Sequence, residues 1–373
     1  MKFTVSTSDL LKQLQAIQGV IASNSVLPIL DNFLFELNNN TLTLSATDLH
    51  ISMTNSVQVA STDTGKIAVP SKILTDTLKA LPEQPLVFNF DDQNAIEINS
   101  ASGTYKLMGE GAADFPRIPT VEQGTKVTLG ADVLFEAITS TIFAVSTDEI
   151  RLAMTGVFFE LEDNAINFVA TDAHRLVKHT QKNIAVPHPG AFIVPRKALN
   201  LLKNALSGVN DEVHLEFNKS NAFFSVNNLS LICRLIDQKF PDYGAVIPKQ
   251  NDKQLVINRS DLLSAIKRIS IFSNKVTHQV RLKIDSDQVT ITAEDMDFSN
   301  SGTETLKCEY NHAEPFEIAF NARFIAEMLS NVNSEQILVD LSLPNRPALI
   351  FPSQQNDNQA LLMLVMPMMI SSN

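Results

Sequence analysis

The chain has 373 residues, 44% of them hydrophobic and 19% charged, which is the balance of an ordinary globular protein with room for two or three domains. Its formal net charge of −12 argues against a protein that is basic throughout, although net charge does not say where the cations lie. Its two cysteines have neither metal-binding nor disulfide spacing, its N-terminus has no apolar signal core, and its longest apolar run (360–370) is shorter than the about 20 residues that cross a bilayer. We therefore expect a cytoplasmic protein with no membrane segment, metal or cofactor.

Four sequence features recur three times in the same order, spaced by 123 to 129 residues. The first is an amphipathic helix, predicted over 8–22, 131–146 and 260–274, with N-cap candidates Ser8, Asp9, Asp132, Ser260 and Asp261. The second is an alternating strand, predicted over 41–47 and 165–171, that runs into "ATD" at 46–48 and 170–172; the third copy has "AED" at 293–295. The third is another helix, predicted over 71–81, 196–206 and 322–332. The fourth is a proline, at Pro116, Pro241 and Pro367.

Each copy therefore holds two helices and several short strands, which predicts an α+β fold of three similar domains. A period near 125 residues is also the commonest size of an independent domain. Polar loops near 120–126 and 248–254 separate the copies. The predicted domains are residues 1–122, 123–248 and 249–373.

The stretch "FVATDAHRLVKHT" (168–180) places Thr171, Asp172 and His174 side by side, like parts of a hydrolase. In that interpretation His174 is a general base paired with Asp172. However, the first copy keeps "ATD" without the histidine, so the Thr and Asp are expected at a strand end and its turn. No activated nucleophile, oxyanion site or metal set accompanies the pair, which makes the hydrolase the weaker hypothesis. A scaffold that assembles without nucleic acid is a third alternative.

The predicted helices are the positive part of this acidic chain. Together, with the helix at 260–274 counted as far as Lys275, they carry a net charge of +4, which leaves −16 on the remainder. If they share one surface, that surface could face a polyanion, but Lys-rich helix faces are also common for solubility alone. In "RKALNLLK" (196–203) the cations Arg196 and Lys197 open a helix, where the macrodipole disfavours them and phosphates are favoured. The chain has no Trp and three Tyr, so we expect contacts to the nucleic-acid backbone rather than base stacking.

Several motifs together resemble the beta sliding clamps of bacterial DNA polymerase III, and the resemblance runs nearly end to end. They are "MKFTV" (1–5), "LPIL" (27–30), "ATDAHRL" (170–176), "VPRKAL" (194–199), "FPDY" (240–243) and "VMPM" (365–368). The resemblance implies a head-to-tail homodimer, a ring of six domains around double-stranded DNA that slides without sequence preference. It implies partners that bind through short linear peptides, among them DNA polymerase subunits and the clamp loader, and no catalytic residues.

The resemblance also assigns residues. For a peptide pocket between the middle and last domains it implies Met154, Thr171, His174, Arg175, Leu176, Pro241, Val246, Asn321, Phe324, Leu364, Val365, Met366, Pro367 and Met368. For DNA contact it implies Asn24, Lys72, Arg196 and Lys197, although Asn24, Asp148 and Leu152 depart from relatives at those positions. For the subunit contact it implies Tyr105 and Leu107 against Ile271 and Phe272, and Thr277 predicts a shallower pocket edge.

Overall fold

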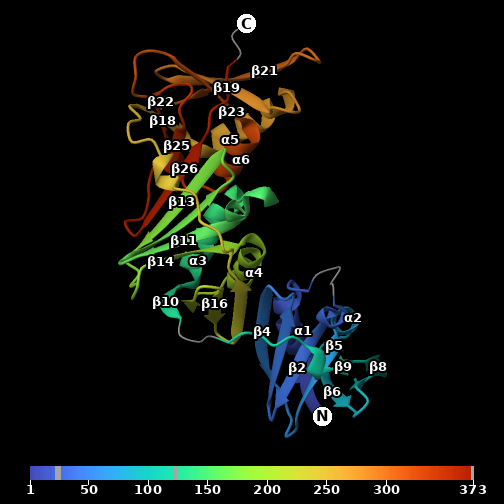
Figure 1. Ribbon diagram of the computed structural model, residues 1–373. Coiled ribbons are helices and arrows are strands. Elements are labelled where there is room, and N and C mark those ends of the chain that lie inside the picture. Colours follow the sequence, from blue (N-terminus) through green and yellow to red (C-terminus); the bar gives the residue numbers. More distant parts are fainter. Residues whose placement is uncertain (22–26, 121–123, 371–373) are drawn as a thin grey trace. The chain divides into compact units, whose positions relative to one another are not determined.

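The computed structural model describes residues 1–21, 27–120 and 124–370 (Figure 1). It divides into two compact units, one formed by Met1–Leu134 with Lys197–Leu235 and the other by Phe135–Arg196 with Ile236–Asn373. Each unit contains one nine-stranded and one four-stranded sheet, and every paired strand is antiparallel to its neighbour. The predicted α+β class is therefore confirmed.

Three groups of four strands, here called the A groups, share one strand order and one connectivity. In each group a first strand pairs with the first of three consecutive hairpin-connected strands. The groups are A1, β1 (Lys2–Ser6), β6 (Pro85–Phe90), β7 (Ala95–Asn99) and β8 (Thr104–Met108); A2, β10 (Thr125–Gly130), β15 (Glu212–Phe217), β16 (Asn221–Val226) and β17 (Leu229–Arg234); and A3, β18 (Lys253–Asn258), β24 (Gln336–Leu341), β25 (Ala348–Pro352) and β26 (Gln359–Val365).

Three further groups, the B groups, repeat a second order in which three hairpin-connected strands are followed by one that returns to the first. They are B1, β5 (Thr64–Pro70), β2 (Asn32–Asn38), β3 (Thr41–Thr47) and β4 (Ile51–Gln58); B2, β14 (Gly190–Pro195), β11 (Gly156–Glu162), β12 (Ala165–Thr171) and β13 (Arg175–Lys182); and B3, β23 (Phe316–Asn321), β19 (Gln279–Ile284), β20 (Gln288–Asp295) and β21 (Asn300–Lys307). The threefold repetition predicted from the sequence is confirmed by these six groups.

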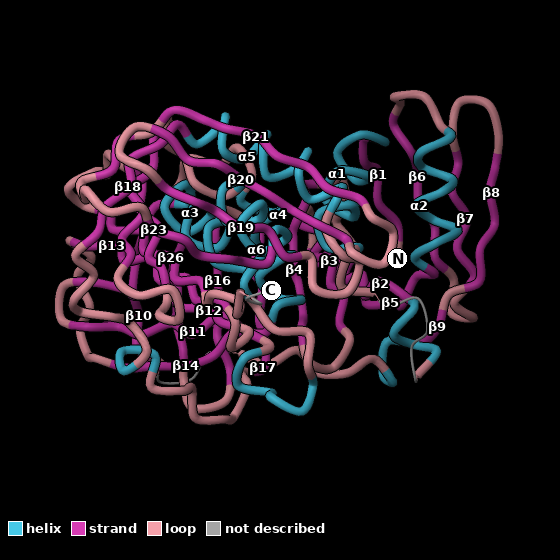
Figure 2. The backbone as a smooth tube through the Cα atoms, turned by 90° about the horizontal axis from the view of Figure 1, so that it is seen from above, coloured by secondary structure: helices cyan, strands magenta, loops and turns pink. Residues whose placement is uncertain are grey.

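The nine-stranded sheets form because a B group pairs with the A group of the next repeat. In the first unit β4 of B1 pairs with β17 of A2, and in the second β13 of B2 pairs with β26 of A3. The short strands β9 (Glu110–Gly111) and β22 (Glu309–Tyr310) complete these sheets. Within the described residues, A1 and B3 stay four-stranded, so β8 and β21 are edge strands; Figure 2 shows β19, β20 and β21 side by side.

The helices follow the repeat as well. The second helix of each repeat is α2 (Ser71–Ala80), α4 (Arg196–Leu206) or α6 (Ala322–Ser330), and α4 has the predicted bounds. The first helices are α1 (Thr7–Gln18), α3 (Ala131–Thr141) and α5 (Arg259–Ile269), each shorter than predicted. Short 3₁₀ turns are η1 (Pro28–Asp31), η2 (Ala112–Asp114), η3 (Ile142–Ala144), η4 (Glu149–Met154), η5 (Tyr243–Ala245) and η6 (Ser270–Phe272).

The predicted N-caps of α1 and α5 lie two or three residues too far along the chain. Ser6 caps α1 by accepting the N–H of Asp9 at 3.2 Å, and Asn258 caps α5 by accepting that of Asp261 at 3.1 Å. In both cases the cap is the last residue of the preceding strand, so the helix begins where the strand ends and the predicted cap residues lie in its first turn. The apolar faces of these helices are buried, and each fully buried Leu or Ile contributes about 1.5–3 kcal/mol; they are Leu10, Leu14 and Ile17 in α1 and Leu262, Ile266 and Ile269 in α5.

Candidate functional site

The turns after β3 and β12 have the same hydrogen bonds. Thr47 and Thr171 each donate from Oγ1 to the carbonyl oxygen four residues further on, at 3.1 and 2.7 Å. Oδ1 of Asp48 and of Asp172 each accepts the backbone N–H groups two and three residues further on, at 2.7 to 3.0 Å. The prediction that this Thr and Asp belong to a strand end and its turn is confirmed.

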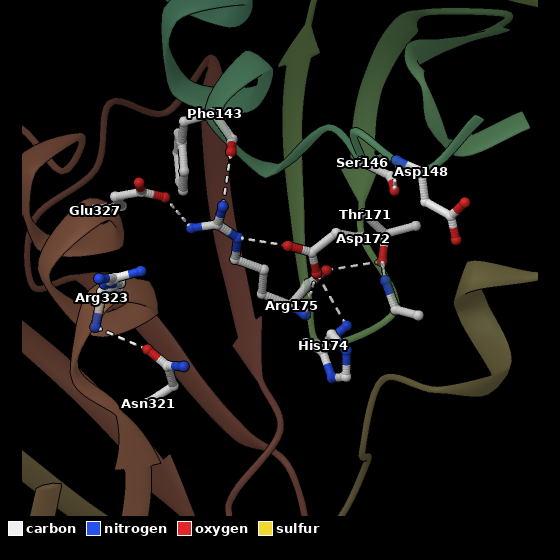
Figure 3. A network of polar contacts seen from close by, with 11 residues as sticks. Phe143, Ser146, Asp148, Thr171, Asp172, His174, Arg175, Asn321, Arg323 and Glu327 are labelled. Atoms are coloured by element: carbon white, nitrogen blue, oxygen red, sulfur yellow. Dashed lines mark hydrogen bonds and ion pairs between the residues drawn. The ribbon is translucent and has the colours of Figure 1, made fainter. Parts of the chain in front are cut away.

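Arg175 is the centre of a buried polar network in the second unit (Figure 3). Its Nε donates to Oδ2 of Asp172 at 3.0 Å, its Nη2 donates to the carbonyl of Phe143 at 2.9 Å, and its Nη1 binds the carboxylate of Glu327 on α6. The guanidinium also lies 4.7 Å from the ring centroid of Phe324. Because the residue is only 7% exposed and three of its five side-chain N–H groups donate to these partners, Arg175 mainly links α6 to β13.

The imidazole of His174 is positioned by an aromatic ring. It stacks on Phe324 with ring centroids 6.0 Å apart and planes 20° from parallel. Both carboxylate oxygens of Asp172 are engaged by the turn and by Arg175, so the aspartate is not arranged to orient the imidazole as in a catalytic pair. This geometry gives the hydrolase hypothesis no support, and His174 is instead an exposed aromatic surface beside Phe324.

An apolar cluster lies beside this network on the sheet that joins B2 to A3. Its buried members are Val169, Leu176, Ile193, Phe240, Leu349 and Leu364, and half-buried side chains, among them Phe158, Ile236, Tyr243, Ile247, Phe351 and Leu362, surround them. The predicted pocket residues Leu176 and Leu364 thus belong to one surface.

The outer part of this apolar cluster is aromatic. Phe158 stacks on Phe240 with centroids 4.6 Å apart and planes 4° from parallel, and Tyr243 meets Phe158 edge-on. The Tyr243 hydroxyl bonds Glu160, and Nζ of Lys178 lies 5.5 Å from the Tyr243 ring centroid. Burial and the hydrogen bond to Glu160 raise the pKa of Tyr243 above its usual range. Sequence reasoning selected only Pro241 from "FPDY", although its two aromatic residues frame the surface.

The C-terminal tail continues from this cluster. Val365 is fully buried in β26, so it supports the surface from beneath, whereas Met366 is 41% exposed. The backbone N–H of Met366 donates to the carbonyl of His174 at 2.8 Å, and that of Met368 donates to Ala319 at 2.8 Å. The tail after β26 therefore lies between the His174 turn and β23, with Pro367 half-buried between its two anchored neighbours.

The other predicted pocket residues have varied positions in the second unit. Val246 follows η5 and is exposed, and Met154 ends η4 half-buried. Asn321 caps α6, with its Oδ1 accepting the N–H of Arg323 at 2.9 Å and its Nδ2 donating to the carbonyl of Thr277 at 3.3 Å. Thr171 holds the turn of His174 as described above. Asn321 and Thr171 thus set backbone positions, whereas Val246 and Met366 offer apolar surface.

A cleft of about 390 Å³ adjoins the network. Arg196, the first residue of α4, lines it together with Asp148, Arg151, His174 and Phe324. Asp148 accepts the N–H of Ile150 at 3.0 Å and the Nε of Arg151 at 2.9 Å, and these bonds lower the pKa of its carboxyl. Three guanidinium groups, those of Arg151, Arg175 and Arg196, therefore line the cleft, and its carboxylates Asp148, Asp172 and Glu327 are already paired.

The four residues predicted to contact DNA differ in their exposure and in whether they already form an ion pair. Asn24 lies outside the described residues. Lys72 on α2 and Arg196 on α4 are exposed, and neither forms an ion pair within the described parts of the chain. Lys197 binds Asp48 of the turn after β3, and its Nζ also donates to the carbonyl of Val20 at 3.1 Å. Lys197 therefore joins the second repeat to the first within one unit.

The predicted subunit-contact residues lie at the open ends of the two four-stranded sheets. Tyr105 and Leu107 are on the edge strand β8. Ile271 and Phe272, in η6 after α5, are 66% and 40% exposed, and nearby Met296 and Phe298 are also exposed. Exposed apolar groups of this size beside an unpaired strand edge are typical of an interface.

Comparison with protein families gives three matches in chain order. The N-terminal domain of the DNA polymerase III beta subunit matches residues 1–119, its central domain 128–242 and its C-terminal domain 244–369. Among curated proteins, the beta sliding clamp of Synechococcus elongatus is 30% identical over 362 residues, covering 94% of this chain and 96% of that protein. The beta sliding clamp of Vibrio cholerae is 29% identical over 368 residues, covering 98% and 99%.

Solved structures agree. The sliding clamp from Pseudomonas aeruginosa bound to griselimycin matches with a TM-score of 0.94 and 28% identity, and that from Bartonella birtlesii bound to griselimycin with 0.92 and 31%. Each match covers 99% of this chain and 100% of the other. A fold and matches of this extent define a DNA sliding clamp. The chain belongs to the family of beta sliding clamps of bacterial DNA polymerase III, and its function is to serve as the clamp that gives this polymerase processivity.

No helix in the described part of the chain is both long and apolar enough to cross a membrane. Within the same residues, no three His, Cys, Asp or Glu side chains gather closely enough to hold a metal ion.

Proposed function

We propose that two copies of this chain close head to tail into a ring around duplex DNA, and that this ring tethers polymerase subunits and other partners without chemistry of its own. The observation that carries the proposal is the pair of open sheet edges. β8 of A1 and β21 of B3 are edge strands. The strands equivalent to β8 are β17 and β26, and those equivalent to β21 are β4 and β13. These equivalent strands are all paired, β17 with β4 and β26 with β13.

An unpaired strand edge exposes a row of N–H and C=O groups that another strand can satisfy. The chain already joins B1 to A2 and B2 to A3 by the same type of strand pairing. Pairing B3 of one copy with A1 of another would repeat that junction, and doing so twice would leave neither β8 nor β21 unpaired in either copy. Such a contact uses different surfaces of the two partners, so it gives a closed ring if the rotation closes and a filament otherwise.

We propose the domain division 1–122, 123–248 and 249–373. The N-terminal and central family models, matching 1–119 and 128–242, fall inside the first two bounds, whereas the C-terminal model, matching 244–369, begins five residues before the third proposed domain. The compact units cut through the second repeat because each unit contains a continuous sheet made by two successive repeats. Since a bacterium replicates its chromosome in the cytoplasm, we propose that compartment for the ring.

For DNA, the proposal rests on Arg196, which is exposed, forms no ion pair within the described residues and lies at the start of a helix, where phosphates are favoured. Contacts of this kind read the phosphate backbone and not the bases, as a clamp that slides must do. Asn24 and Lys197 stay in the proposal as secondary contacts.

For partners, we propose the apolar cluster around Leu176 and Phe240, with Val246 and Met366 at its margin, as the site for short linear peptides. Large aromatic side chains and an adaptable methionine suit a surface that serves several peptides. In this proposal Arg175 and Asn321 position the surface, and His174 and Phe324 extend it. The solved relatives bind griselimycin, and we propose that this chain takes such a ligand on the same surface.

Retention on DNA tests the ring. The chain should elute from a sizing column as two copies, stay on nicked circular DNA once loaded, and slip off when the circle is linearised. Phe272→Asp, which buries an unpaired charge in the contact, should elute as one copy and be lost from both forms. Equal retention on circular and linear DNA would replace the ring by an ordinary DNA-binding protein.

Binding of griselimycin tests the peptide site. Phe158→Ala removes the ring that stacks on Phe240 and should weaken binding by about 10-fold or more, because aromatic stacking adds to the buried area. Leu34→Ala is the matched control, since Leu34 is the third residue of β2 as Phe158 is of β11. Equal weakening by both variants would argue against the site.

A further inference from the structure

The two internal junctions share a polar lock beside the paired strands. At the first, Asp48 in the turn after β3 binds Lys197 from the second helix of the next repeat. At the second, Asp172 in the turn after β12 binds Arg175, which binds Glu327 from the second helix of the next repeat. In both locks Oδ1 of the aspartate holds the turn while Oδ2 faces the cation.

The strand register identifies which residues near the edge strands β8 and β21 are equivalent to the aspartates and the lysine of the internal junctions. Pro70 and Pro195 occupy the same place, opposite the first residue of β2 and of β11, so Lys72 and Lys197 are equivalent second residues of α2 and α4. Each aspartate lies two residues after an alanine near the end of its strand. These alanines, Ala46, Ala170 and Ala293, face Met53, Val177 and Gly302. Asp295 is therefore the counterpart of Asp48 and Asp172.

Within the described residues, neither Lys72 nor Asp295 forms an ion pair. Lys72 is exposed and lines a cleft of about 1180 Å³ together with Tyr105 of the edge strand β8. Oδ1 of Asp295 accepts the side-chain amide of Asn274 at 3.5 Å and the N–H of Asp297 at 3.3 Å, which is the turn-holding role of its counterparts. Asp295 is 3% exposed and its Oδ2 has no cation partner in the described residues, so the exposed Asp297 is the carboxylate of this turn that a second copy can reach.

The internal junctions also predict which residues of the two edge strands would face each other. A row of opposed residues crosses each A group, starting three residues before the end of its first strand; the rows are Phe3–Phe88–Ile98–Tyr105, Val127–Leu215–Phe224–Leu231 and Leu255–Val339–Ile350–Met363. The last residues of the second and third rows face Met53 and Val177 across the junctions. The same rule sets Tyr105 opposite Gly302 of a second copy.

Local packing at Gly302 fits this register. A Cβ at position 302 would lie 2.8 Å from Cδ2 of Phe272, so the ring of Phe272 covers the glycine. With no side chain between them, Tyr105 of one copy would meet Phe272 of the other directly. Two of the four residues predicted from the sequence for the subunit contact, Tyr105 and Phe272, thus meet in this register.

We infer that Lys72 is a seam residue: it pairs with the Asp295–Asp297 turn of a second copy, in a strand register that opposes Tyr105 and Gly302. This inference rests on the proposed ring and assigns Lys72 a role in holding it closed, in place of contact with DNA. The seam is then a second example of the Asp48–Lys197 ion pair, made between molecules; at the second internal junction the cation on Asp172 is Arg175 of the same repeat.

Dimer dissociation measured at low protein concentration tests the lock. Lys72→Met should raise the dimer Kd by about 3- to 10-fold, an effect that shrinks at high salt, as for an exposed or partly buried ion pair. The turn variant Asp295→Asn with Asp297→Asn keeps the side-chain acceptors and should have a similar effect, and combining it with Lys72→Met should add little. Lys79→Met, a charge change at the other end of α2, is the control.

Two results would overturn the assignment of Lys72. One is an unchanged dimer Kd for Lys72→Met; the other is fully additive losses in the combined variant. If Lys72 contacts DNA instead, its replacement would leave the dimer intact and lower the salt dependence of DNA binding by about one phosphate contact.

Disulfide trapping tests the register separately. Antiparallel pairing of Tyr105 with Gly302 also opposes Thr104 and Thr303, two exposed residues. Thr104→Cys with Thr303→Cys, in a Cys308→Ser background, should cross-link two copies on mild oxidation, whereas Thr104→Cys with Thr305→Cys should not, because that pair is displaced by two residues along the strand. The reverse outcome would refute the register while leaving the ring in place; a wild-type chain that elutes as a single copy would instead refute the ring itself.

Discussion

Replacing Arg175 by methionine should release α6 from β13. The variant keeps an unbranched apolar side chain between Phe143 and Phe324 but removes the guanidinium and its three hydrogen bonds. It leaves Asp172 and Glu327 without their cation. The consequence follows from how buried each of these partners is.

The side chain of Arg175 is 8% exposed and that of Asp172 16%, so this pair is shielded from water, while Glu327 is 53% exposed. Removing one partner of a buried pair costs about 3–5 kcal/mol. Asp172 retains its two backbone N–H bonds, and Glu327 can turn to solvent. We therefore expect the lower end of that range, about 3 kcal/mol.

Hydrogen exchange followed by mass spectrometry measures this locally, without assuming that the whole chain unfolds in one step. Amides of α6 should lose about 100-fold in protection, since a factor of ten corresponds to about 1.4 kcal/mol.

Arg151→Met is the matched control for Arg175→Met. Arg151 binds Asp148 with the same spacing in sequence and an Nε–Oδ2 distance of 2.9 Å, against 3.0 Å for the buried pair, but its side chain is 42% exposed. It should cost about 0–1 kcal/mol. Equal effects of the two replacements, or unchanged protection of α6, would refute the reasoning from burial.

Three further predictions concern charge and packing. His179 is 2% exposed, and burial lowers its pKa, so the unfolded chain binds a proton first: stability should fall as pH drops below about 6.5, and His179→Gln should flatten that part of a urea-midpoint profile against pH. An unchanged profile would assign the acid sensitivity to other groups. Arg196→Ala should reduce the salt dependence of DNA binding by about one phosphate contact with no change in sequence preference; a loss confined to particular sequences would contradict backbone contact. Gly302→Val should weaken the dimer, because its Cβ meets the ring of Phe272, whereas Thr303→Val on the same strand should be tolerated; size-exclusion chromatography at falling concentration compares the two.

Much of the fold could be predicted because local patterns and the repeat agree. The strands at 41–47 and 165–171 have the predicted bounds, since strict alternation between turn residues leaves little freedom in register. The helix at 196–206 is also as predicted, because its apolar spacing begins directly after a proline that ends a strand. The caps at Ser6 and Asn258 could not be recognised, since each is at once the last residue of a strand and the cap of a helix.

The candidate site was less accessible to sequence reasoning. From sequence, Arg175 looks like a free donor, because the groups that occupy it, Phe143 and Glu327, lie 32 and 152 residues away. Lys197 looks like a phosphate contact for the same reason, since Asp48 is 149 residues away. The repeat predicts that equivalent residues have equivalent neighbours, but only strand pairing shows that the neighbours of one copy belong to the next.

Because A and B groups alternate, the architecture of the proposed ring does not depend on how many modules one polypeptide contains. A module here is one repeat, with its A group and its B group. Both junctions between successive repeats within the chain are strand pairings, and in the proposed ring the junction between two copies is a strand pairing without a peptide linker. A gene encoding two such modules would expose the same two ends and could assemble a six-module ring from three molecules, while a tandem fusion could do so from one. Cutting the linker between two modules should therefore cost chain connectivity but not the joint, and mutations that preserve strand register should be tolerated at either kind of boundary.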